Sequence, residues 1–93
     1  MPLDPEIHAP ARLQLMTMLS AVNQAEFATL RDRLEVSDSV LSKHLSALSQ
    51  AGYVTTRKDI FQRKRTTWVK ITTGGIRALE RHVAALRALI DGV

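Results

Sequence analysis

The spacing of apolar residues changes at Gly52, and this change limits the folds that the chain can adopt. Before Gly52, apolar side chains recur every three or four residues within residues 27–34 and 41–48, which is the spacing of helices that bury one face. After it, β-branched residues stand at every second position from Thr67 to Ile71, which favours a strand. The sequence therefore predicts two short helices followed by a β-hairpin.

Local residue types indicate where the elements begin and end. Pro10 suits the first turn of a helix, Ser37 is a good N-cap, and Gly52 can end a helix in a left-handed conformation. The Thr pair at 72–73 can cap a last helix. The expected helices span about residues 10–22, 25–34, 38–51 and 73–90, the expected strands 53–58 and 66–72 are joined by a loop at 59–65, and residues 1–9 form an extended arm.

Size and composition limit the class of protein. A chain of 93 residues predicts one domain over residues 1–93, here of mostly helical α+β class. It has no cysteine and no catalytic motif, and its histidines are scattered, so we expect no enzyme activity, metal site or cofactor. The N-terminus lacks a signal-peptide pattern, and no apolar stretch approaches the roughly 20 residues of a membrane span. We expect a cytoplasmic protein that does not enter membranes.

The positive charge is concentrated in one segment. Residues 1–52 carry four Lys or Arg against six Asp or Glu, whereas residues 53–73 carry six basic residues against Asp59 alone. Such a concentration is typical of a surface that binds a polyanion. Because a helix-turn-helix followed by a basic hairpin can occupy the DNA major groove and the flanking backbone, the sequence predicts double-stranded DNA as the partner.

The third expected helix has a polar face opposite its leucines. Small hydroxyl side chains let a helix lie deep in the major groove, and lysine can reach guanine or phosphate. His44, at the edge of the leucine stripe, either donates to a phosphate or packs. An ordinary solvated helix would show the same pattern. The candidate DNA-binding residues of this recognition helix are Ser39, Ser42, Lys43, Ser46 and His44.

The hairpin, or wing, carries a second group of candidates. Basic side chains there can neutralise phosphates or enter a narrow minor groove. They can instead serve only to keep the sheet edge from pairing with other strands. Trp68 is expected to pack rather than to stack on bases. The candidate wing residues are Arg57 and Lys58 on the first strand and Arg63, Lys64 and Arg65 at the tip.

The last expected helix has apolar residues at alternating spacings of three and four, which is the seam of a coiled coil. We predict that this seam and the first helix form a homodimer interface, since a small domain gains buried area by pairing. Simple packing of the last helix against the first is the alternative. The candidate interface residues are Leu13, Met16, Ile76, Leu79, Val83, Leu86 and Ile90.

Three segments together resemble a known family. They are SDSVLSKHLSALSQAGYV at 37–54, RTTWVKIT at 65–72 and a G-x-R-A-L helix at 75–79, and over about residues 10–90 the chain resembles short winged-helix regulators of the MarR/ArsR superfamily. The resemblance implies a homodimer that represses or activates transcription at a pseudo-palindromic operator. It also implies reading-helix contacts by Ser39, Ser42, Lys43 and Ser46 and wing contacts by Arg63 and Arg65.

The chain also departs from that family. Glu35 stands in the turn where many relatives carry Gly, Asn or Asp, so a left-handed residue there would cost about 1 kcal/mol. The cysteine metal motif of ArsR sensors is absent, as are the extra helices that enclose effectors in larger MarR proteins. The leading hypothesis is a dimeric regulator, with repression favoured. The alternatives are a winged-helix protein-interaction module and a sensor that holds a small-molecule effector between the first and last helices of the dimer.

Overall fold

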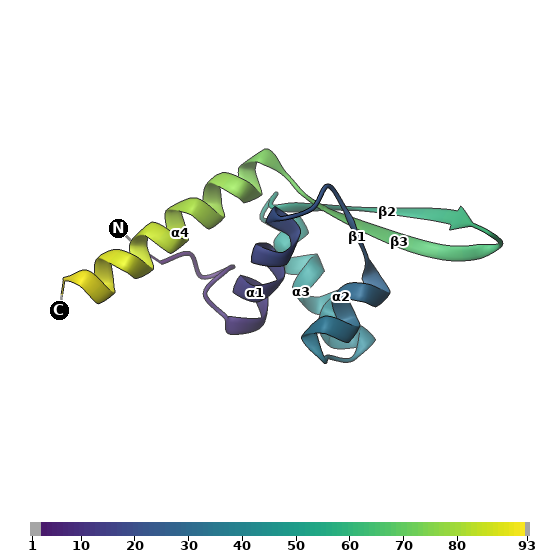
Figure 1. Cartoon of the computed structure of the whole chain (residues 1–93), viewed down its shortest axis with the longest axis horizontal. Helices are drawn as coiled ribbons and strands as arrows, with labels where there is room; N and C mark the ends of the chain where they lie inside the picture. The colour runs from purple at the N-terminus through teal and green to yellow at the C-terminus, as the bar shows by residue number, and fades with distance from the viewer. Residues whose placement is uncertain (1–2, 93) are drawn as a thin grey trace.

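Four helices and a three-stranded antiparallel sheet make up the computed structural model, which describes residues 3–92 apart from the side chain of Phe61. The sheet order is β1-β3-β2. In Figure 1 the β2–β3 hairpin projects to one side and α4 extends to the other. The elements are α1 (Pro10–Ser20), β1 (Ala25–Glu26), α2 (Phe27–Leu34), α3 (Asp38–Gln50), β2 (Val54–Phe61), β3 (Lys64–Ile71) and α4 (Thr73–Asp91).

This arrangement is a winged helix and confirms the predicted α+β class, with two changes in the sheet. Ala25 and Glu26, expected to begin a helix, instead pair with Val69 and Trp68 as a third strand. The expected loop at 59–65 is also too long, because β2 and β3 pair from Val54 to Phe61. Only residues 62 and 63 turn the chain, both with positive φ, as in the type I′ turns that match the twist of a hairpin.

The turn and caps around α3 follow the local sequence. The Ser37 hydroxyl accepts a hydrogen bond from the Val40 N–H at the start of the helix, as expected of an N-cap. Gly52 has φ 81° after the helix, and the Tyr53 N–H donates to the Leu48 carbonyl. Glu35 closes α2 in the left-handed region, with φ 55° and ψ 45°. The recognition helix is thus fixed at both ends.

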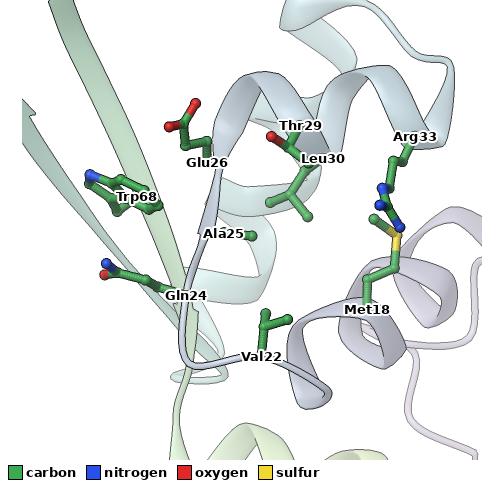
Figure 2. A pocket seen from close by; sticks show the side chains of 9 residues that line it. All are labelled: Met18, Val22, Gln24, Ala25, Glu26, Thr29, Leu30, Arg33 and Trp68. Atoms are coloured by element: carbon green, nitrogen blue, oxygen red, sulfur yellow. The ribbon is translucent and has the colours of Figure 1, made fainter. Parts of the chain in front are cut away.

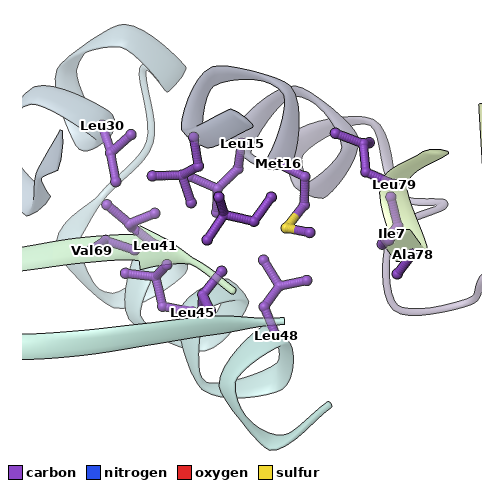
Figure 3. Packing of buried hydrophobic residues seen from close by; sticks show 13 residues of the cluster. Ile7, Leu15, Met16, Leu30, Leu41, Leu45, Leu48, Val69, Ala78 and Leu79 are labelled. Atoms are coloured by element: carbon purple, nitrogen blue, oxygen red, sulfur yellow. The ribbon is translucent and has the colours of Figure 1, made fainter. Parts of the chain in front are cut away.

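The core lies between the three N-terminal helices and the sheet, and α4 packs on α1 beside it (Figure 3). The leucines predicted to face inward from α3 are all buried there. Gly75 lets the first turn of α4 approach β2 closely, because a Cβ at this position would overlap the Tyr53 carbonyl oxygen. The buried apolar residues are Ile7, Leu15, Met16, Leu19, Leu30, Leu41, Leu45, Leu48, Val54, Val69, Ile71, Ala78, Leu79 and Ala85.

The N-terminal segment is not the extended arm that the sequence suggests. It turns at residues 4–8, where the N–H groups of Ile7 and His8 donate to the Asp4 carbonyl. Ile7 is fully buried, and the Asp4 N–H donates to Nδ1 of the buried His82 at 3.0 Å. The segment packs because Ile7 supplies apolar area that the small core needs.

The face of α4 turned toward the core differs from the predicted seam. Leu79 and, on α1, Met16 are buried within the chain's own core, so neither is available to a partner in this structure. Sequence spacing defines an apolar stripe on a helix but does not say whether its own core or another chain covers it. The buried residues of α4 are Gly75, Ala78, Leu79, His82 and Ala85, while Val83 and Leu86 are half-buried and Ile76 and Ile90 exposed.

Candidate nucleic-acid interface

A groove runs between the polar face of α3 and the wing. Its floor is largely hydroxyl and amide groups, and Lys58 lies on its wing side. Several of these residues could not be predicted from the sequence, because the position of strand threonines beside a helix depends on the register of the hairpin. The lining residues are Phe27, Asp38, Ser42, Leu45, Ser46, Ser49, Gln50, Thr56, Lys58 and Thr67.

The candidates on α3 divide into two groups. Ser39, Ser42, Lys43 and Ser46 are exposed on the face opposite the buried leucines. His44 is half-buried on another side, and its Nδ1 accepts a hydrogen bond from Arg12 Nε at 3.0 Å. Of the two roles expected for His44, this contact fits packing within the protein. His44 therefore does not belong to the exposed polar face of α3.

Arg12 also affects the protonation of His44. Burial, followed by the positive charge of Arg12, lowers the pKa of His44, because both disfavour the charged imidazolium. Arg12 Nη1 pairs in addition with Glu6 at 2.9 Å. The N-terminal segment, α1 and α3 are therefore joined through one arginine.

The basic wing residues lie on two faces of the hairpin. Cross-strand partners point to the same side of a sheet, and side chains alternate along each strand. The pairs Lys58–Thr67 and Ile60–Arg65 therefore share the side of the buried pair Val54–Ile71, which faces α3.

Two other predicted wing cations lie on the side away from α3. Arg57 and Lys64 are on the opposite face by the same alternation. Arg57 is also engaged there, since it donates to Asp59 at 2.6 Å and to Gln24 at 3.4 Å. Lys58 and Arg65 thus point toward the groove, Arg63 lies in the turn, and Arg57 and Lys64 point away from the groove.

Both acidic side chains near this surface are held by arginine. Asp38 at the start of α3 pairs with Arg31 at 3.0 Å, and the hydrogen bonds to Asp32 and Asp38 raise the pKa of Arg31. The bond from Arg57, with a second from the Ile60 N–H, holds the pKa of Asp59 below its usual range. Because each carboxylate has a cation beside it, its repulsion of a phosphate is reduced.

The polar helix face beside a basic hairpin is the arrangement of a winged-helix DNA-binding protein. The family model for the winged helix DNA-binding domain matches residues 11–90. The chain belongs to this family. The domain is a DNA-binding one, and the relatives of known role described next are transcriptional regulators rather than enzymes.

Two relatives show how close this winged-helix chain is to known regulators. The structure of a transcriptional regulator homologue from Pyrococcus horikoshii OT3 has a TM-score of 0.87 and 32% sequence identity, covering 94% of this chain and 86% of that one. The transcriptional activator HlyU of Vibrio cholerae is 42% identical over 62 residues, which are 63% of this chain and 56% of HlyU. The HlyU structure has a TM-score of 0.67, covering 81% of this chain and 77% of that one.

A second hollow, shown in Figure 2, includes no residue of α3. It has a volume of about 420 Å³ between the end of α1, β1, α2 and the half-buried Trp68. Trp68 thus lines this hollow together with apolar side chains such as Met18 and Leu30.

Within residues 3–92, no helix is both long and apolar enough to cross a membrane.

Proposed function

We propose that this winged-helix protein is a homodimeric, sequence-specific transcription regulator. The observation that carries the proposal is the groove between α3 and the wing, which hydroxyl groups of α3 line together with Lys58. Arg65 lies farther along the same face of the hairpin. A helix with small polar side chains can enter the major groove, while cations on a hairpin neutralise flanking phosphates. Ser39, Ser42, Lys43 and Ser46 read the bases, and Arg63, Lys58 and Arg65 contact the backbone or the minor groove.

Uncovered apolar side chains on α4 support pairing. Leu89 and Ile90 are 56% and 72% exposed near the end of the helix, and Ile76 is 40% exposed near its start. In Figure 1 the C-terminal part of α4 projects beyond the other helices. Covering these side chains with a second copy adds the apolar burial that a domain of this size lacks. A two-fold dimer then presents two α3 helices to half-sites about 34 Å apart on DNA.

The direct test is selection of bound fragments from the source genome with the purified protein, followed by affinity measurements over a range of salt. We expect enriched fragments to contain inverted repeats, with log affinity falling linearly with log salt. Lys43→Ala and Arg65→Ala each remove a cation near the groove and should weaken binding, while Lys70→Ala, on the wing face away from α3, should do so much less. No enrichment at low salt, or equal effects of all three variants, would contradict the proposal.

The direction of regulation is a separate question. The family resemblance implies repression or activation, of which we expect repression, whereas HlyU of Vibrio cholerae is a transcriptional activator. We retain repression as the proposal, and a reporter under the selected promoter tests it. Expression of the wild-type protein should lower the reporter signal, whereas expression of the Lys43→Ala variant should leave it unchanged. A rise in signal with the wild type would show that the protein is an activator.

A further inference from the structure

Ile60 is an apolar residue in an unusual position. Its side chain is 72% exposed and stands one residue before the end of β2, next to the turn of the wing. Its cross-strand partner is Arg65, and the two side chains share the face of the hairpin that is turned toward α3. Ile60 therefore lies on the side that the proposed function turns toward DNA.

The surface around Ile60 continues into the groove beside α3. The hollow at the wing is lined by Lys58, Asp59, Ile60, Arg65, Thr66 and Thr67. Of these, Lys58 and Thr67 also line the α3 groove. A duplex seated on α3 would meet Lys58 next and then Ile60 and Arg65. The apolar side chain is thus part of one surface with the predicted reading residues.

The charge and the hydrogen bonds around Ile60 favour a nucleic acid as the occupant. The cations Lys58 and Arg65 stand beside it on the same face, and the one carboxylate that lines this hollow, Asp59, is paired with Arg57. A second copy of this basic wing would be repelled. The Ile60 N–H already donates to Asp59 Oδ1 at 2.8 Å, so this amide is not free to pair with an added strand.

We propose that Ile60 is a specificity-determining residue, which makes the wing prefer A·T pairs in the minor groove beside the α3 site. This inference rests on the proposed function. In the minor groove only guanine presents an amino donor, at N2. An apolar side chain against the groove floor leaves that donor without an acceptor, which is unfavourable, while an A·T floor has no such donor. Arg65 and Lys58 hold the wing there through the phosphates.

The experiment uses the tightest fragment from the genomic selection, in three versions. The base pairs contacted by the wing, located by footprinting, are set to A·T, G·C or inosine·C. Inosine keeps the major-groove acceptors of guanine but lacks the N2 amino group, so only the minor-groove donor changes between the last two. The variants are Ile60→Thr, which keeps β-branching and adds an acceptor, and Val22→Thr, a matched change at another exposed apolar residue.

The wild-type protein should bind the A·T and inosine versions about tenfold more tightly than the G·C version, the factor expected for one unsatisfied buried donor. Ile60→Thr should remove most of this preference without changing the salt dependence, since no charge is altered. Val22→Thr should keep the preference.

Three results would overturn the inference while leaving DNA binding intact. They are equal affinity of the wild type for the G·C and inosine versions, a preference that survives in Ile60→Thr, and an equal loss in Val22→Thr. A preference that survives in Ile60→Thr would assign the selectivity to the arginines and groove width. If the wild type binds no selected fragment at all, the proposed function itself fails, which is a different outcome.

Discussion

At the scale of single residues, Glu35 shows how packing can override local preference. Its left-handed conformation joins α2 to α3, and the Val36 N–H donates to the Arg31 carbonyl at 3.3 Å across this turn. A β-carbon makes such a conformation costly by about 1 kcal/mol. The resemblance to winged-helix regulators predicted this cost, because many relatives carry Gly, Asn or Asp where this chain has Glu35. The turn holds α3 at its angle to α2 despite that cost.

Glu35→Gly should therefore stabilise the protein. The backbone strain of about 1 kcal/mol is relieved, less the extra entropy that glycine has in the unfolded chain. Urea unfolding should show a higher midpoint for Glu35→Gly and no comparable gain for Glu35→Ala, which keeps the β-carbon. If alanine stabilises as much as glycine, the side chain rather than the backbone is responsible.

His44 should make the stability depend on pH. Its pKa in the folded protein is lowered from 6.5, so the unfolded chain binds the proton first as pH falls. This contribution to stability is complete above about pH 6.5 and is lost as pH falls toward the lower folded pKa. Unfolding midpoints between pH 8 and 5 should drop more for the wild type than for His44→Gln, which does not titrate. Parallel curves would show that His44 carries no such linkage.

At the scale of the elements, the sequence predicts those that are long and periodic. The spacing of Leu41, Leu45 and Leu48 and the Ser37 cap located α3 correctly. β1 was missed because two residues have no period, and its pairing with β3 depends on contacts distant in sequence. The turn at residues 62–63 was missed because it contains none of the Gly or Asn that usually indicate a tight hairpin.

The junction of β2 and α4 supplies an element-scale prediction. Gly75→Ala should destabilise the protein by about 1–3 kcal/mol, because its methyl group would displace the Tyr53 carbonyl. That carbonyl also accepts the Thr72 N–H at 2.9 Å. Gly74→Ala is the matched control, since its β-carbon would lie 3.6 Å from the nearest atom, an ordinary contact. Thermal unfolding should separate the two; equal melting temperatures would mean that the helix shifts at little cost.

At the scale of the whole molecule, the wing and the end of α4 define an elongated chain of 53 × 25 × 21 Å. The sequence predicted an apolar seam on α4 but could not divide it between the chain's own core and a partner. Which of its apolar residues the core covers depends on where α4 extends beyond the other helices, and the spacing of apolar residues in the sequence does not show this. Leu79 faces the core, whereas Ile90 and Leu89 remain uncovered.

Leu89→Lys and Ile90→Lys should therefore convert the proposed dimer into a monomer. Burying a lysine in an apolar interface is unfavourable, while the fold is unaffected because both positions are exposed. The sedimentation mass should fall from twice to once 10.4 kDa, and operator affinity should fall with it. Val22→Lys, the same change at an exposed residue of another surface, should remain dimeric. A monomeric wild type would contradict the proposed dimer.

The shape of the chain also bears on how fast and in what order it meets its target. Residues 53–73, which include the hairpin that projects to one end of the molecule (Figure 1), carry a net charge of +5, and all other residues together carry −1. Such a charge distribution is an electric dipole, which orients a diffusing molecule in the field of a polyanion. The hairpin should arrive first and α3 should settle afterwards. Low salt should then speed encounter far more than it slows departure.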